Sequence, residues 1–266
     1  MNPVHQARKR FGQNFLTDKV IIDKIVSCVN PTVEDNLIEI GPGKGALTDL
    51  LISQCPKMQA LEVDRELVQF LKKKYSQYKD FVVHEEDALK TDYANFKFGD
   101  KLRLVGNLPY NISTPLLFHM ISQVGVVKDL HFMLQREVAN RLVARPENKD
   151  YGRLSVIIQY HCRVVPLIDV PAKAFRPMPQ VESTFIRLVP HQKKPVAAVC
   201  EQHLNHIVKG CFQKRRKILR NSLDCSQNEL KLLDNEIDLF QRPEELSVAD
   251  FVKISNILYL NREYNQ

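Results

Sequence analysis

A short motif, Asn107-Leu108-Pro109-Tyr110, follows an apolar run that ends at Val105. The side-chain oxygen of Asn107 and a backbone carbonyl next to Pro109 can each accept one hydrogen of an aromatic amine. This arrangement turns the nitrogen lone pair toward an electrophile and stabilises the positive charge that develops on nitrogen. Pro109 cannot donate a backbone hydrogen bond and stiffens the turn, and the Tyr110 ring offers a face for a base lifted out of its stack. The motif therefore predicts chemistry at an exocyclic adenine amine.

A glycine-rich turn, Gly41-Pro42-Gly43-Lys44-Gly45, follows the apolar run that ends at Ile40. Such a turn lets backbone approach a ligand, although alone it also fits an ordinary tight turn. Glu62 ends the next run, about 20 residues on, where an acid reaches a ribose diol. Asp87 ends the third run and can accept from an adenine amino group. Together these residues predict an adenosine site, which a dinucleotide enzyme or a methyltransferase can share.

The motif at Asn107 distinguishes between these two classes, because hydride transfer has no use for it. Methyl transfer from a sulfonium requires no general base, since the alkylated nitrogen loses its proton to water. The sequence offers no obvious base near the motif, which argues against a hydrolase. These observations favour S-adenosylmethionine as the cofactor.

The elements that position these residues alternate in type. Short β-rich runs end at Ile40, Val63, Val83, Val105 and Leu134, with helical spacing between them. This alternation predicts an α/β fold with a parallel sheet. Two β-prone segments, 154–165 and 181–189, predict an antiparallel pair at its edge. The polar, proline-bracketed residues 190–195 predict a domain boundary, and the remaining chain has helical spacing.

Composition favours a nucleic-acid partner. The 266 residues contain 38 Lys and Arg against 31 Asp and Glu, a net charge of +7, which suits an anionic partner. Six scattered cysteines without a C-x-x-C pair indicate a reducing compartment, so we expect a cytoplasmic protein. We find no signal peptide and no apolar run long enough to span a membrane, and we expect no membrane association.

The densest basic stretch is 209–220, which contains no acid. Phe212, Leu219 and Leu223 recur near helical spacing, so one face can pack while the cations remain outside. A run of charges is often only a solvated face, but we favour contact with RNA phosphates. The predicted RNA-binding residues are Arg8, Lys9, Arg10, Lys214, Arg215, Arg216, Lys217 and Arg220.

Four potential metal ligands, Cys200, His203, His206 and Cys211, lie near one another in the sequence. On a helix, residues at successive threes spread around the axis, and the fourth needs a bend to complete a tetrahedral site. The inferred chemistry also has no use for zinc. We therefore expect no metal.

With these motifs in hand, the whole chain closely resembles the KsgA/RsmA family of small-subunit ribosomal RNA adenine dimethyltransferases. The resemblance includes the segments 10–18 and 175–183. It implies that Asn14, Leu16, Gly41, Glu62, Asp87 and Asn107 bind S-adenosylmethionine. It also implies that Phe175 lies opposite Tyr110, so that the two rings sandwich the target base, and that Asn107, Leu108, Pro109, Tyr110 and Phe175 form the catalytic site.

The resemblance implies a Rossmann-like S-adenosylmethionine-dependent methyltransferase fold over residues 1–190. Its sheet has seven mainly parallel strands with an antiparallel edge, and a small all-α domain over residues 196–266 contacts RNA. The implied activity is dimethylation of two adjacent adenines at N6, in the loop of the 3′-terminal hairpin of small-subunit (16S) ribosomal RNA, within a late pre-ribosomal particle. We expect a monomer.

Three alternatives remain open at this stage. The first is a large-subunit ribosomal RNA adenine methyltransferase of the macrolide-resistance type, which shares the fold and an Asn-Pro-type motif. The second is a ribosome-assembly factor whose RNA binding matters more than its catalysis. The third is a nicotinamide dehydrogenase, which would bind a dinucleotide tightly.

Overall fold

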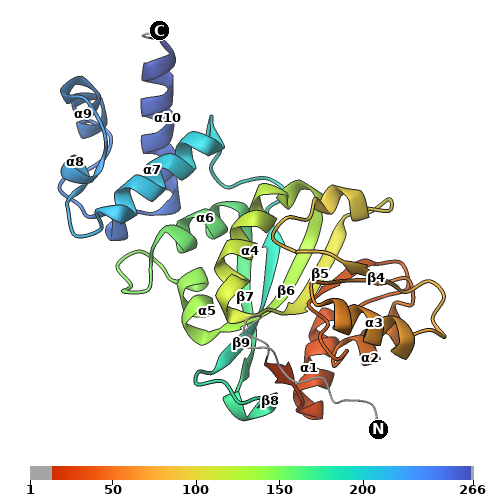
Figure 1. Cartoon of the computed structure of the whole chain (residues 1–266). Helices are drawn as coiled ribbons and strands as arrows, with labels where there is room; N and C mark the ends of the chain where they lie inside the picture. Colours follow the sequence, from red (N-terminus) through yellow and green to blue (C-terminus); the bar gives the residue numbers. More distant parts are fainter. Residues whose placement is uncertain (1–13, 265–266) are drawn as a thin grey trace. The chain divides into compact units, whose positions relative to one another are not determined.

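The computed structural model describes residues 14–264 and divides into two compact units. The first contains the described chain up to Ala139 together with Val164–Pro190, and the second contains Asn140–Arg163 and the chain from His191 onward. Figure 1 shows the elements. In chain order they are β1 (Phe15–Leu16), α1 (Lys19–Val29), β2 (Asn36–Ile40), α2 (Thr48–Gln54), β3 (Gln59–Glu62), α3 (Arg65–Lys74), β4 (Val82–Glu85), η2 (Tyr93–Phe96), β5 (Leu102–Asn107), α4 (Tyr110–Ser122), η3 (Val124–Val126), β6 (Val127–Gln135), α5 (Arg136–Val143), α6 (Arg153–His161), β7 (Cys162–Val170), η4 (Ala172–Ala174), β8 (Phe175–Arg176), β9 (Ser183–Pro190), α7 (Glu201–Gln213), α8 (Leu219–Ser222), α9 (Gln227–Asp234), η5 (Pro243–Glu245) and α10 (Val248–Tyr264).

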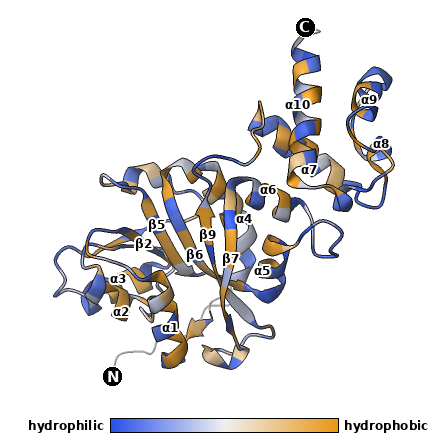
Figure 2. Ribbon diagram, turned by 180° about the vertical axis from the view of Figure 1, so that it is seen from behind, coloured by the Kyte–Doolittle hydropathy of each residue, from blue (hydrophilic) through white to orange (hydrophobic). Residues whose placement is uncertain are grey.

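A seven-stranded sheet forms the centre of the first unit, in the order β4-β3-β2-β5-β6-β9-β7. The pairs from β4 to β6 are parallel, whereas β9 is antiparallel to β6. Its strands form where the sequence has apolar, β-rich runs: Leu102, Leu104 and Val105 of β5 are fully buried. In Figure 2 the strands β5, β6 and β9 accordingly carry long orange, hydrophobic stretches. The predicted α/β sheet with an antiparallel edge is confirmed.

The helices α1 and α3 show how local sequence sets the helix ends. Asp18 precedes α1 and accepts a hydrogen bond from the Ile21 N–H at 3.2 Å, while Asp64 precedes α3 and accepts from the Glu66 N–H at 3.0 Å. Each carboxylate satisfies a backbone donor that the first helical turn leaves unpaired. Asp18 and Asp64 are therefore helix caps.

The prediction of a strand over 154–165 is wrong for its first part, since residues 153–161 form the helix α6 and only Cys162–Val170 form β7. Val156, Ile157 and Ile158 favour strands when only one face of the segment is covered. In α6 the five successive residues 154–158 are all buried, so the hydrophobic spacing shows no clear helical period, and packing outweighs the preference of β-branched residues.

The second unit is helical and includes α6 as well as the segment after Pro190. Helices α6 and α7 both pack against α10, and the Tyr151 hydroxyl donates to the Leu246 carbonyl at 2.8 Å. Phe212 lies between the rings of Tyr151 and Phe251. These contacts explain why the compact unit contains residues 140–163, whereas the sequence favours a single break near Pro190.

A buried ion network joins the first unit at β5, β6 and β9. Arg103 binds Asp129 through Nε at 3.0 Å and Asp35 through Nη1 at 2.7 Å, and Arg187 binds Asp129 at 2.8 Å. Burial alone would raise the pKa of Asp35, but hydrogen bonds from Arg103, the Thr32 N–H and Lys128 outweigh it and lower the pKa to about 2. The network thus links β5, β6 and β9 with Asp35, which directly precedes β2, and each buried charge has a partner of opposite sign.

We predict that Asp129→Asn lowers the free energy of unfolding by about 3 kcal/mol, because it removes one of the two carboxylates that compensate the buried Arg103 and also the carboxylate that binds Arg187. Urea unfolding followed by circular dichroism measures the change. Lys128→Met is the control, since Lys128 is 57% exposed in its ion pair with Asp35, and we expect it to cost below about 1 kcal/mol. Equal losses for the two variants would contradict this assignment.

Candidate active site

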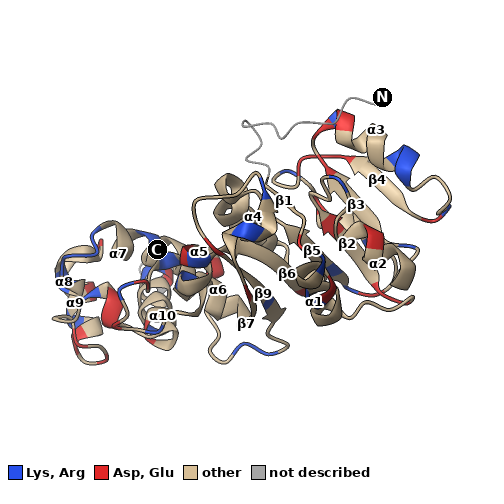
Figure 3. Ribbon diagram, turned by 90° about the horizontal axis from the view of Figure 1, so that it is seen from below, with Lys and Arg blue, Asp and Glu red and all other residues tan. Residues whose placement is uncertain are grey.

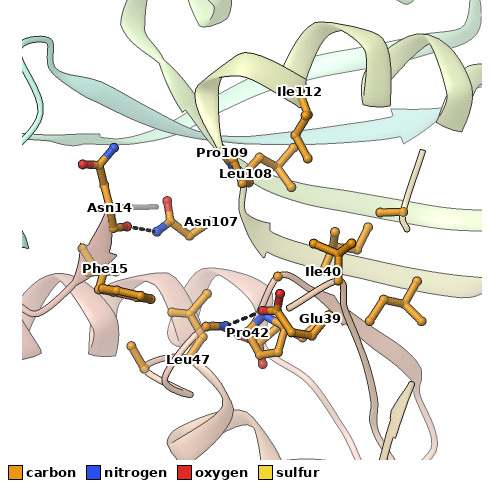
Figure 4. Close-up of a pocket in the computed structure, with 18 of the residues that line it drawn as sticks. Asn14, Phe15, Glu39, Ile40, Pro42, Leu47, Asn107, Leu108, Pro109 and Ile112 are labelled. Atoms are coloured by element: carbon orange, nitrogen blue, oxygen red, sulfur yellow. Dashed lines mark hydrogen bonds between the residues drawn. The ribbon is translucent and has the colours of Figure 1, made fainter. Parts of the chain in front are cut away.

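A pocket of about 360 Å³ opens at the carboxyl ends of the parallel strands of the first unit. Figure 4 shows Asn14 and Phe15 of the N-terminal segment beside Asn107, with Glu39 and Pro42 at the glycine turn. This is the edge where open α/β sheets bind ligands. The lining residues include every cofactor-binding residue that we predict: Asn14, Leu16, Gly41, Glu62, Asp87 and Asn107.

The glycine turn forms one wall of the pocket. Gly41 and Gly43 both have positive φ, 63° and 58°, a conformation that other residues rarely adopt. A Cβ atom on Gly43 would meet the Phe15 ring at 3.0 Å, whereas one on Gly41 would meet no protein atom within 4 Å. The backbone at Gly41 therefore borders open pocket space that a ligand can approach.

Glu62 and Asp87 bring carboxylates to the same pocket from β3 and from the loop after β4. Glu62 is buried, and its two oxygens accept the N–H groups of Gly43 at 3.3 Å and Asp64 at 3.0 Å. Burial raises the pKa of Glu62 above its usual value. Asp87 accepts the Leu89 N–H at 3.0 Å and is partly exposed. Both carboxylates are held by backbone donors and keep further acceptor positions.

Asn107 lies at the end of β5 with a defined amide orientation. Its Nδ2 donates to the Asn14 carbonyl at 2.9 Å, the dashed line in Figure 4. Asn14 precedes β1, which pairs antiparallel with β8 through Leu16 and Phe175. Within residues 14–264, no hydrogen bond reaches the Asn107 Oδ1 atom. The amide nitrogen is thus committed to the Asn14 carbonyl, and no donor in the described part of the chain occupies the oxygen.

Tyr110 begins α4 directly after Pro109, whose φ of −57° suits the position before a helix. The Tyr110 hydroxyl forms a 2.8 Å hydrogen bond with Ser183 Oγ of β9, and the Ser183 side chain is fully buried. Burial raises the pKa of the Tyr110 phenol, which therefore stays neutral near pH 7. A fixed, neutral ring at the rim of the pocket suits stacking against a planar group.

The structure corrects the expected position of Phe175. Its side chain is 0% exposed and belongs to the buried cluster that also contains Leu16, Ile22 and Phe185, and it does not line the pocket. An apolar ring gains more free energy in such a core than at a solvated rim. In this conformation Phe175 supports β1 from the core and does not face Tyr110 across the pocket.

The basic stretch is not one continuous helix. Helix α7 ends at Gln213, residues 214–217 form a turn, and α8 begins at Leu219. Arg215 is bound to the Glu244 carboxylate and to the Lys149 carbonyl. The remaining cations that we expect to contact RNA are exposed: Lys214, Arg216, Lys217 and Arg220. Arg8, Lys9 and Arg10 lie outside the described residues.

The residues that the structure describes contain neither a metal-binding cluster nor a membrane-spanning helix. Among residues 14–264, no three His, Cys, Asp or Glu side chains are grouped to hold a metal ion. His203 instead bonds to Ser255 Oγ at 3.0 Å. None of the described helices has the length and apolar character needed to cross a bilayer. All six cysteines are free thiols.

Comparison with known proteins decides the family. The model of the family described as "Ribosomal RNA adenine dimethylase" matches residues 4–260. The chain belongs to the ribosomal RNA adenine dimethylase family. It is 50% identical over 256 residues to a protein of Saccharophagus degradans, covering 96% of each chain, and 51% identical over 252 residues to one of Coxiella burnetii, covering 94% of this chain and 97% of the relative. Both relatives are named ribosomal RNA small subunit methyltransferase A.

Solved structures agree with this assignment. A dimethyladenosine transferase from Plasmodium falciparum superposes with a TM-score of 0.81 at 26% identity, covering 94% of this chain and 98% of that chain. The 23S rRNA methyltransferase ErmE has a TM-score of 0.67 at 22% identity, covering 91% and 99% of the two chains, and shows a shared fold. The predicted family membership and the predicted methyltransferase fold are both confirmed.

Sequence reasoning missed Glu39, a pocket residue in β2. Glu39 lines the pocket, is buried, and accepts a 2.6 Å hydrogen bond from Thr48 Oγ1 of α2. Burial raises the pKa of Glu39 from 4.5 to about 7, against the lowering effect of the Thr48 hydrogen bond. An acid inside the apolar run 37–40, directly before the glycine turn, is the signal that could have identified it.

We predict that Glu39 makes the protein less stable as the pH rises from about 4.5 to about 7. Over this range the folded protein keeps a proton that the unfolded chain has released, so the free energy of unfolding falls with pH. Glu39→Gln keeps an acceptor for Thr48 and removes the titration. We therefore expect the melting temperature of this variant to fall less than that of the wild type.

Differential scanning calorimetry at several pH values between 4.5 and 7.5 measures this difference. Glu85→Gln is the matched control, because Glu85 is an exposed glutamate at the end of β4. A profile for Glu39→Gln that parallels the wild type would contradict the raised pKa.

Proposed function

We propose that this protein uses S-adenosylmethionine to dimethylate N6 of two adjacent adenines in the loop of the 3′-terminal hairpin of small-subunit ribosomal RNA. The observation that carries this proposal is the orientation of Asn107, whose amide nitrogen is bound to the Asn14 carbonyl, while its oxygen lies at the pocket and accepts no hydrogen bond from residues 14–264. An amide oxygen in this position can accept a hydrogen of an adenine amine, and the fixed Tyr110 ring beside it can stack on the base.

The pocket residues fit S-adenosylmethionine, which when bound supplies an electrophilic methyl group on a sulfonium. The open space beside Gly41 allows close approach of an adenosyl compound to the backbone. Glu62 offers acceptor positions to a ribose diol, and Asp87 offers one to an adenine amino group. Asn14 and Leu16, held by the pairing of β1 with β8, cover the pocket from the N-terminal side.

The protein's own groups orient the target amine. Asn107 Oδ1 and the Leu108 carbonyl, which precedes Pro109, each accept one amine hydrogen and aim the nitrogen lone pair into the pocket. Both acceptors also stabilise positive charge on the nitrogen as it forms its new bond. The proton then leaves to water. Tyr110 stacks on the base, with its ring fixed through Ser183, while Phe175 acts indirectly by holding β1.

The substrate is assigned to the small subunit because the relatives that share about half of their residues with this chain carry that name. Lys214, Arg216, Lys217 and Arg220 are exposed and supply charge for RNA phosphates, with Arg8, Lys9 and Arg10 as further candidates. Arg215, which is bound to Glu244, serves the local fold. We place the protein, as a monomer, on a late pre-ribosomal particle in the cytoplasm, the reducing compartment that its free thiols suit.

The direct test is transfer of labelled methyl groups to purified under-methylated small subunits, large subunits and naked RNA, followed by mapping of the modified bases. We expect dimethyladenosine at two adjacent adenines of the small-subunit RNA. Label only in large-subunit RNA would favour the macrolide-resistance type of enzyme, and no transfer to any substrate would overturn the enzymatic assignment.

We predict that Asn107→Ala lowers the rate of methyl transfer by at least about 100-fold, because a partly buried acceptor for the developing charge is lost. RNA affinity should change less than about two-fold, since the phosphate contacts are unaffected. Single-turnover transfer and filter binding measure the two quantities. Asn95→Ala, an exposed residue in η2, is the matched control, and a parallel loss of RNA binding in Asn107→Ala would point to misfolding.

We predict that Ser183→Ala lowers kcat/KM about five-fold, because loss of one hydrogen bond of about 1 kcal/mol frees the Tyr110 ring. Tyr110→Phe removes the same hydrogen bond from the other side. The double variant should therefore be no worse than either single one.

A base analogue distinguishes a positioning role for Ser183 from a structural one. With 2-aminopurine at the target adenine, stacking on Tyr110 quenches fluorescence, and we expect less quenching in both single variants. Ser122→Ala, which removes an exposed serine hydroxyl at the end of α4, is the control. Additive losses in the double variant would exclude coupling through this hydrogen bond.

A further inference from the structure

An exposed phenylalanine lies beside the basic turn of the second unit. Phe240 is 68% exposed, in the segment between α9 and η5. Two backbone hydrogen bonds join this segment to the start of α8: the Leu219 N–H donates to the Gln241 carbonyl at 2.8 Å and the Arg220 N–H donates to the Leu239 carbonyl at 3.1 Å. Phe240 therefore lies between two residues whose backbones are bonded to the basic stretch.

The conformation of this segment is set by its neighbours. Leu239 is fully buried and anchors it, and the Phe240 N–H donates to the Asp238 carboxylate at 2.9 Å. The backbone at Phe240 is thus held in place, and disorder of the segment does not explain why the ring is exposed. A large aromatic ring held in solvent loses the free energy of burial, which a partner with a flat apolar face can restore.

Exposed cations lie on both of the segments that these backbone hydrogen bonds join. Arg216, Lys217 and Arg220 precede or begin α8, and Arg242 follows Phe240 by two residues. All four are exposed, and no carboxylate among residues 14–264 is within ion-pairing distance of their side chains. Figure 3 marks Lys and Arg in blue on the ribbon around α8, with acidic positions in red nearby.

The nearby acids have other partners. Glu244 is bound to Arg215, and the Glu245 carboxylate accepts the Arg242 N–H. Asp238 accepts the Phe240 N–H. Of these three acids only Glu244 is neutralised by a cation, but none of them lies within ion-pairing distance of the four cations, which are therefore available to an external anion.

We propose that Phe240 and the cations Arg216, Lys217, Arg220 and Arg242 form a binding site for unpaired nucleotides of RNA. The Phe240 ring stacks on one base, and the four cations bind the phosphates on either side of it. Aromatic rings interleaved with positive charge are the usual means of binding single-stranded nucleic acid without reading its sequence. This inference rests on the proposed function and adds a base-stacking residue to a basic surface that would otherwise bind only phosphate.

The chain contains no tryptophan, so Phe240→Trp introduces a single fluorescent reporter at the proposed site. We expect saturable quenching of its emission by a single-stranded oligoadenylate and little quenching by an abasic oligomer of the same length. The control is Phe98→Trp, because Phe98 is 72% exposed and lies between Lys97 and Lys101 in the first unit. Equal quenching of the two reporters, or equal quenching by the abasic oligomer, would overturn the proposal.

Affinity and its salt dependence separate stacking from charge. We expect Phe240→Ala to bind the oligoadenylate about ten-fold more weakly and Phe240→Tyr to bind nearly as tightly as the wild type. The slope of log affinity against log salt should be unchanged in Phe240→Ala and reduced in Arg220→Ala, since only the latter removes a phosphate contact. Unchanged affinity in Phe240→Ala would exclude stacking.

Methyl transfer to small subunits, measured in parallel with the wild-type protein, keeps the two hypotheses separate. Transfer by the wild type together with no quenching of Phe240→Trp would reject the stacking site and leave the proposed function intact. Quenching of Phe240→Trp without methyl transfer by the wild type would support the stacking site and reject the proposed function.

Discussion

Parallel pairing on both sides of β2 is the constraint on which the site depends. Because β2 pairs in parallel with β3 and β5, three strands end at the same edge. Gly106 allows the last residues of β5 to approach β2 closely, since a Cβ atom there would lie 2.5 Å from the Ile40 carbonyl oxygen. This approach brings Asn107 to the pocket that the glycine turn and Glu62 also line. One sheet topology thereby assembles groups that are far apart in the sequence.

The chemistry-bearing residues could be predicted because each directly follows a strand that its own sequence specifies. Gly41, Glu62, Asp87 and Asn107 all come at or just after the end of an apolar, β-rich run, and all line the pocket. Hydrophobic periodicity and helix caps such as Asp64 are local signals. Local sequence signals therefore locate the strand ends, and the strand ends in turn identify these residues of the site.

Other features depend on contacts with distant residues that no local pattern reports. Helix α6 contains Val156, Ile157 and Ile158, which favour strands, and the burial of the five successive residues 154–158 hides the periodicity that would identify it. The role of Arg215 is set by Glu244, 29 residues later. The residue type of Phe175 fits a buried core position as well as the rim of a pocket. Only the pairing of β8 with β1 places its ring in the core. In each case packing, rather than residue type, decides the outcome.

Charge within the pocket separates two cofactor classes that share an adenosine. The described part of the lining carries four acids, Glu39, Glu62, Glu86 and Asp87, and one cation, Lys44, whose ammonium lies 4.9 Å from the Phe15 ring centre. Burial and the neighbouring carboxylates Asp49 and Glu62 raise the pKa of Glu39, so further negative charge at the glycine turn is unfavourable. A dinucleotide would bring its pyrophosphate to this turn, whereas a sulfonium and an ammonium would each find a compensating carboxylate. A basic protein with an acidic pocket thus suits a cationic methyl donor inside and an anionic RNA outside.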